Sequence, residues 1–85
     1  MYCVTIGDLQ RRVGRNLRLY RLERGVSQEA FATQLGVHRT YMGSVERGER
    51  NLTLQTVESM AGHLDIDPLD LLAPPDSTPH SLWPE

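Results

Sequence analysis

The chain has 85 residues, a length that suits one small domain, and its single cysteine, Cys3, excludes an internal disulfide and a cysteine-based zinc site. No apolar run approaches the ~18 residues that a membrane-spanning helix needs. The first residues also lack the charged-then-apolar order of a secretion signal. We therefore expect a cytoplasmic protein without a membrane anchor.

The net charge of −2 conceals an asymmetry between the two parts of the chain. Residues 1–50 contain all nine basic residues, every one an arginine, and five acidic residues, which leaves +4. Residues 51–85 carry six acidic residues and no basic one, which gives −6. Arginine can hold phosphate or guanine with two hydrogen bonds, so the basic part suits a polyanion partner. A biased genome composition would also explain the exclusive use of arginine. Only the positions of the arginines can therefore indicate whether they bind a polyanion.

Apolar residues recur at helical spacing along most of the chain, and no stretch alternates with a period of two. A first helix is predicted over about residues 8–23, with its arginines mostly on solvated faces. Gly25 is expected to end it in a left-handed conformation. Its apolar stripe consists of Leu9, Val13, Leu17 and Tyr20.

The next two helices are short and separated by glycines. Ser27 is expected to cap a second helix that ends at Leu35, where Gly36 supplies the break. A third helix is predicted from residue 38 or 39 to about residue 47, stopped by Gly48.

Two more helices complete a predicted all-α, five-helix bundle. Thr53 can cap the fourth, and Asp67 followed by Pro68 opens a short fifth helix through Leu72. The apolar face of the fourth helix consists of Leu54, Val57, Met60, Ala61 and Leu64.

The predicted organisation is an N-terminal extension at 1–7, a domain at 8–72 and a flexible tail at 73–85. The tail holds four of the five prolines and cannot propagate a helix. Trp83, the sole tryptophan, lies in this tail. It is either loosely held or docked on its own domain or on a partner.

Residues 28–45 have the pattern of two helices that cross steeply over a short turn. Ala32 allows a close approach between them, and Gly36 can adopt the positive φ that the turn requires. The apolar wedge between them is predicted to contain Phe31, Leu35, Val37, Met42 and Val45. The outward face of the third helix would then present Arg39, Thr40, Tyr41, Gly43 and Ser44, a short polar surface that fits a DNA major groove.

With these residues the sequence resembles the helix-turn-helix family of the Cro and phage-repressor type, also called the XRE family. The resemblance runs from about residue 13 to residue 72. It rests on Ser27-Gln28-Glu29, Ala32, Leu35-Gly36-Val37, Glu46-Arg47-Gly48 and Pro68-Leu69-Asp70-Leu71-Leu72. Two more strings resemble the controller proteins of restriction-modification systems, namely His38-Arg39-Thr40-Tyr41 and Arg50-Asn51-Leu52-Thr53-Leu54.

The resemblance implies DNA contacts by Gln28, Arg39, Thr40, Tyr41, Ser44, Arg50 and Asn51. Gln28 occupies a phosphate-binding position, and Arg39 and Thr40 occupy base-reading positions. The tyrosine and serine fall where the family contacts phosphate, sugar or a neighbouring base. Arg50 and Asn51 lie in the loop that contacts the DNA backbone in this family. A Glu46–Arg47 pair would fix the bundle.

The sequence departs from the family pattern at Leu52, where many members have proline, and at Asp65, where many have glycine. Gly62 inside the fourth helix costs about 1 kcal/mol relative to alanine. These departures concern the expected dimer face more than the DNA face. The dimer face is predicted to include Leu64, Ile66, Leu69 and Leu72, unless these residues simply close the monomer core.

The sequence thus predicts a dimeric transcription regulator on a palindromic operator, which either blocks RNA polymerase or contacts it. An antitoxin that also binds a toxin, and a protein-interaction module with the same fold, remain alternatives. The three histidines, His38, His63 and His80, lack the spacing of metal ligands. His38 is expected to cap a helix or face phosphate. No catalytic triad or cofactor motif is present, so we expect neither an enzyme nor a cofactor.

Overall fold

The computed structural model describes residues 5–74, and these form five helices with no strand. The helices are α1 (Asp8–Glu23), α2 (Gln28–Leu35), α3 (Arg39–Glu46), α4 (Leu54–Leu64) and α5 (Pro68–Leu71). The predicted all-α class is confirmed. Most of the predicted extension and tail, including Trp83, lies outside the described residues.

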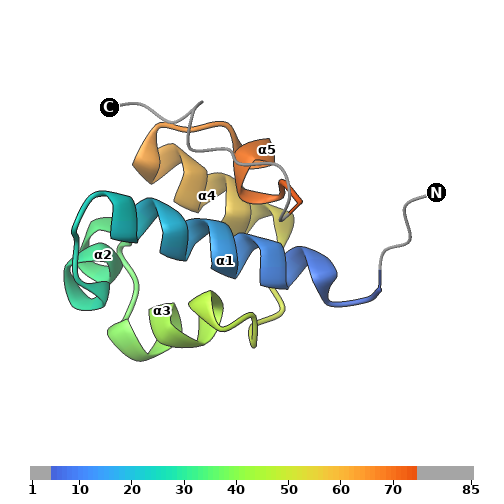
Figure 1. The fold of residues 1–85 in the computed structure, drawn as a ribbon, viewed down its shortest axis with the longest axis horizontal. Coiled ribbons are helices and arrows are strands. Elements are labelled where there is room, and N and C mark those ends of the chain that lie inside the picture. Colours follow the sequence, from blue (N-terminus) through green and yellow to red (C-terminus); the bar gives the residue numbers. More distant parts are fainter. Residues whose placement is uncertain (1–4, 75–85) are drawn as a thin grey trace.

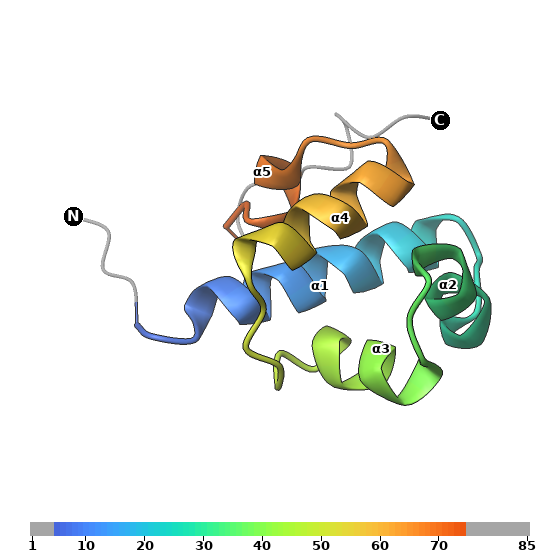
Figure 2. The same cartoon turned by 180° about the vertical axis from the view of Figure 1, so that it is seen from behind.

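The long helix α1 runs through the middle of the domain (Figure 1). The α4–α5 pair lies on one side of it and the α2–α3 pair on the other, as the reverse view also shows (Figure 2). Every other helix can therefore bury its apolar face at or near α1. None of the helices within residues 5–74 is long and apolar enough to cross a membrane.

All five helices contribute side chains to one hydrophobic core. The predicted stripe of α1 is buried at Val13, Leu17 and Tyr20. The prediction for Leu9 is wrong, because this side chain is 48% exposed near the start of the helix. The remaining buried hydrophobic residues are Phe31, Ala32, Leu35, Met42, Val45, Val57, Met60, Ala61, Leu64 and Leu71.

Two glycines allow α1 and the end of α3 to approach closely. A Cβ atom added to Gly14 would lie 2.2 Å from the carbonyl oxygen of Val45, so no side chain fits there. Gly48 has a φ of 75°, and a Cβ atom at this position would lie 2.7 Å from Cγ of Arg11. The Nε2 atom of Gln10 donates to the Gly48 carbonyl at 2.8 Å, which ties the turn after α3 to α1.

Three helices begin at the predicted side-chain caps. The side chains of Ser27, Thr53 and Asp67 each accept a hydrogen bond from a backbone N–H in the first turn of α2, α4 and α5. Helix α4 ends at Leu64 and is followed by the C-cap residue Asp65, whose φ of 57° lies in the left-handed region. This explains why glycine is favoured at that position.

A buried asparagine, which the sequence reading did not single out, joins α1 to α5. Asn16 is fully buried, and its Nδ2 atom donates to the carbonyls of Leu71 at 2.9 Å and Ala73 at 3.1 Å. The same atom lies 3.2 Å from the Asp70 carbonyl. These bonds satisfy carbonyls that the end of α5 leaves without helical partners and fix the direction in which the chain leaves the domain.

Candidate nucleic-acid interface

The turn between α2 and α3 is set by local hydrogen bonds. Gly36 adopts a φ of 73°, and the Val37 N–H donates to the Ala32 carbonyl at 2.9 Å. His38 then caps α3, because its Nδ1 atom accepts a hydrogen bond from the Thr40 N–H at 3.1 Å. The predicted capping role of His38 is confirmed, and the direction of α3 is fixed at its first residues.

The beginning of α3 is the exposed part of this helix. Arg39 and Thr40 are exposed, and Tyr41 is half-buried. The expectation that Gly43 and Ser44 also point outward is wrong, because both residues are buried. Their side of the helix turns toward α2 and toward the loop after α3, so only the first turn and its neighbours are open to a ligand.

Ser44 instead holds an arginine of the following loop. Its hydroxyl donates to the Tyr41 carbonyl at 2.8 Å and accepts a hydrogen bond from Nε of Arg50 at 2.9 Å. The guanidinium carbon of Arg50 lies 5.2 Å from the centroid of the Tyr41 ring, within range of a cation–π interaction. Arg50 is exposed, so its outer N–H groups remain open to solvent while its inner edge is fixed.

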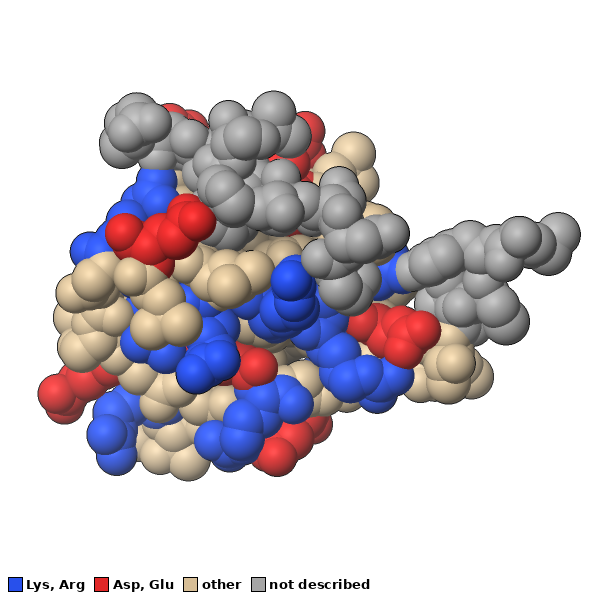
Figure 3. Space-filling view, in the orientation of Figure 1, with Lys and Arg blue, Asp and Glu red and all other residues tan. Residues whose placement is uncertain are grey.

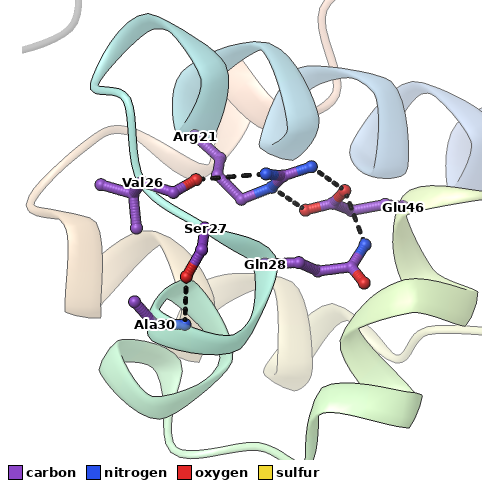
Figure 4. Close-up of polar contacts among 6 residues, drawn as sticks. All are labelled: Arg21, Val26, Ser27, Gln28, Ala30 and Glu46. Atoms are coloured by element: carbon purple, nitrogen blue, oxygen red, sulfur yellow. Dashed lines mark hydrogen bonds and ion pairs between the residues drawn. The ribbon is translucent and has the colours of Figure 1, made fainter.

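A nearly buried ion pair joins the C-terminal end of α3 to α1 (Figure 4). Arg21 of α1 donates from Nε and Nη2 to the two carboxylate oxygens of Glu46, at 2.8 and 3.0 Å. Its Nη1 atom donates to the Val26 carbonyl at 3.1 Å. Gln28, from the first turn of α2, also points toward Glu46, and its Nε2 atom donates to Oε1 at 3.1 Å. One carboxylate therefore joins α1, α2 and α3.

The ion-pair partner of Glu46 differs from the expectation. The predicted Glu46–Arg47 pair is wrong, since Arg47 pairs with Glu49 at 3.1 Å on the surface, where both side chains are more than half exposed. The true pair is almost buried, with side-chain exposures of 12% for Arg21 and 3% for Glu46. A sequence signal was available, because Gln10, Gly14, Leu17 and Arg21 follow the helical spacing of one face of α1.

Arginines gather over α1 and below it toward α3, with acidic side chains between them (Figure 3). At the start of α1, the Asp8 carboxylate accepts a hydrogen bond from the Thr5 N–H at 2.9 Å and pairs with Arg11. These contacts lower the pKa of Asp8. In α5, burial and the nearby Asp67 raise the pKa of Asp70. Helix α5, which carries Asp70, lies on the opposite side of α1 from α3 and the candidate interface (Figure 1).

The residues predicted for a dimer face are not equally accessible. Leu69 is 69% exposed, and Ile66 and Leu72 are half-buried. Leu64 is only 3% exposed and belongs to the monomer core, so it cannot contribute to a dimer face in this conformation. Within residues 5–74, no group of three or more histidine, cysteine or acidic side chains is placed to hold a metal ion.

Helices α2 and α3 are joined by a short turn at Gly36, and the start of α3 is exposed. This is the geometry of a helix-turn-helix. A family model described as "Helix-turn-helix domain" matches residues 12–73, most of the chain. The chain belongs to this helix-turn-helix family. The relatives and structural neighbours named below are described as a hypothetical transcription factor and as control or controller proteins.

Two relatives illustrate the sequence similarity. The "Neisseria hypothetical transcription factor" of Neisseria meningitidis is 43% identical over 68 residues, which cover 80% of this chain and 64% of that relative, just under two thirds of its length. The control protein C.SmaI of Serratia marcescens is 45% identical over 65 residues, covering 76% of this chain and 77% of that protein.

Solved structures show the same fold. The Neisseria factor superposes with a TM-score of 0.74 at 38% identity, over 89% of this chain and 87% of that one. The restriction-modification controller protein C.AhdI of Aeromonas hydrophila gives a TM-score of 0.64 at 42% identity, over 73% and 94%. The controller protein C.Esp1396I, solved as a tetramer with its natural 35 base-pair operator, gives 0.64 at 32% identity, over 74% and 83%.

Proposed function

We propose that the chain is a DNA-binding transcription regulator that inserts the start of α3 into the major groove. The observation that carries this proposal is the exposure of Arg39 and Thr40 at the start of α3, a helix whose direction is fixed by a cap and a buried ion pair. A preorganised arginine can donate two hydrogen bonds to a guanine edge, worth about 1–3 kcal/mol of base discrimination. Arg39 and Thr40 are therefore the proposed base-reading residues.

The flanking residues are proposed to bind the DNA backbone. Gln28 uses one amide N–H for Glu46, and its second N–H is available to a phosphate at the N-terminus of α2. The exposed Arg50 and Asn51 would contact phosphates beyond α3, with Tyr41 beside them. We assign Ser44 an indirect role, in which its hydroxyl holds Arg50 for these contacts.

One domain of this size covers few base pairs, so specific binding is proposed to need two copies on a palindromic site. The exposed Leu69, together with Ile66 and Leu72, forms the proposed dimer face. It includes the exposed side of α5, which lies on the side of α1 opposite α3 (Figure 1). The acidic side chains from Glu58 to Asp70 would then lie away from DNA in each half of the dimer.

The similarity to control proteins supports a finer proposal. The chain would act in the cytoplasm as a restriction-modification controller that binds the promoter of its own gene and that of a neighbouring endonuclease. It would exclude RNA polymerase from the promoter or contact it directly, without catalysing a reaction. The relatives named above are regulators and control proteins, which favours this function over the antitoxin alternative.

A salt titration separates DNA binding from a protein-interaction module. Fluorescence anisotropy with labelled duplex DNA should give an affinity that falls linearly with salt concentration on logarithmic axes, because phosphate contacts release counterions. Gln28→Ala should weaken binding to all duplexes alike. An affinity that is independent of salt, or no affinity for any duplex, would contradict the proposed function.

A further inference from the structure

Exposed apolar side chains converge at the N-terminal end of α1. Among residues 5–74, five large hydrophobic side chains are exposed, and three of them lie around one cavity: Ile6, Leu9 and Leu54, with exposures of 100%, 48% and 74%. The cavity has a volume of about 240 Å³, and its walls also include Leu52, Val57 and Leu72. It lies where the starts of α1 and α4 meet the loop after α3 and the end of α5.

Such a surface is costly to leave in water. Scattered exposed leucines need no explanation, but several around one concave apolar site indicate that another group covers them. The cavity is smaller than the ~300–1,000 Å³ typical of clefts for small molecules, which suits one large side chain. An aromatic ring offers the largest apolar contact for that space.

The chain itself leaves the domain beside this cavity. Leu72 lines the wall, and Asn16 holds the carbonyl of the next residue, Ala73, at 3.1 Å. Arg12 adds a hydrogen bond to the Leu72 carbonyl at 3.4 Å. The described chain ends at Pro74, two residues after the cavity wall. Whatever follows Pro74 therefore starts close to the apolar site.

The segment beyond Pro74 carries a suitable occupant. Within residues 75–85 the only large apolar side chains are Leu82 and Trp83, which are adjacent. Trp83 lies nine positions after Pro74, and at ~3.3 Å per residue this stretch can span roughly 30 Å. That length is sufficient to turn back to a wall only two residues before Pro74.

We propose that the C-terminal segment folds back on its own domain and inserts Trp83 into this cavity. The docking would cover Ile6, Leu9 and Leu54. It would also restrain the loop after α3, because Asn51 and Leu52 belong to the cavity wall. The docking itself does not depend on DNA binding, although the restrained loop is the one proposed to grip the DNA backbone.

Trp83 is the sole tryptophan, so intrinsic fluorescence of the full chain reports on it directly. The parent protein should emit at shorter wavelength than the urea-unfolded chain and resist quenching by acrylamide. Leu54→Asp should move both readouts to the values of the unfolded chain while far-UV circular dichroism stays unchanged. Leu22→Asp is the matched control, since Leu22 is 50% exposed at the other end of α1 and should leave both readouts unchanged.

Several outcomes would overturn the proposal. Parent fluorescence already equal to that of the unfolded chain would show that Trp83 is solvated. Equal responses to the two aspartate substitutions would place Trp83 outside this cavity. Protection that disappears on dilution would assign the cavity to the segment of a second copy. Should Leu54→Asp fail to fold, Leu9→Gln tests the same wall at another exposed position.

Discussion

Ser44 Oγ lies 2.9 Å from Nε of Arg50, so a buried hydroxyl of α3 holds an exposed arginine of the next loop. The bond leaves the outer edge of the guanidinium exposed. If Arg50 binds DNA as proposed, the buried Ser44 controls that contact without touching the ligand.

Ser44→Ala should therefore weaken operator binding through Arg50. Loss of one hydrogen bond worth about 1 kcal/mol corresponds to roughly a fivefold higher Kd. In an Arg50→Ala background the same substitution should have no further effect, as a double-mutant cycle measured by anisotropy will show. Thr33→Ala removes a hydroxyl that bonds the Glu29 carbonyl in α2 and serves as the control. Additive losses from Ser44→Ala and Arg50→Ala would contradict the indirect role.

The Arg21–Glu46 pair should dominate the polar contribution to stability. Glu46→Gln leaves the nearly buried Arg21 guanidinium without its counter-charge, and breaking a buried pair costs about 3–5 kcal/mol. Glu49→Gln disrupts an exposed pair with Arg47 and should cost less than about 1 kcal/mol. Urea unfolding of both variants measures the difference, and similar midpoints for the two would refute this assignment.

Two substitutions in or next to α4 should stabilise the domain. Asp65 holds a φ of 57°, so Asp65→Gly relieves the left-handed conformation. Gly62 lies inside α4, and a Cβ atom added there would meet no atom within 4 Å, so Gly62→Ala should add about 1 kcal/mol. A gain of that size raises the Tm of a domain this small by about 4–8 °C. Calorimetry that finds either variant less stable would show a constraint other than backbone conformation.

The raised pKa of Asp70 makes a prediction about pH. Burial and Asp67 disfavour the charged carboxylate in the folded state, so the pKa is higher there than in the unfolded chain. Stability should accordingly fall as pH rises through the folded pKa, and below the unfolded pKa no penalty remains. Asp70→Asn should be more stable than the parent at pH 7 and equal to it near pH 3. A difference that does not change with pH would rule out titration as the cause.

Features set by neighbouring residues were predictable from the sequence. The caps at Ser27, Thr53 and Asp67 and the turn at Gly36 follow from local backbone and side-chain chemistry, and all four are present. The five helices and the exposed start of α3 follow from the same signals together with helical periodicity.

Features that depend on contacts between distant residues were not predictable in the same way. Glu46 has arginines at positions 21 and 47 within reach on sequence grounds, and only the packing of α1 on α3 selects Arg21. The sequence predicts that Ser44 points outward from α3. In the structure, Arg50 of the following loop donates a hydrogen bond to its hydroxyl. Asn16 gives no local sign that it bonds carbonyls 55 to 57 residues away.

The most direct test of the central proposal is selection of bound duplexes from a random DNA library by the parent protein and by Arg39→Ala. The parent should enrich one motif with twofold symmetry, whose half-sites lie about one helical turn apart. Arg39→Ala should lose the preference at one position in each half-site and keep the others. An unchanged motif for Arg39→Ala, or no enrichment by the parent at any salt concentration, would contradict the placement of α3 in the major groove.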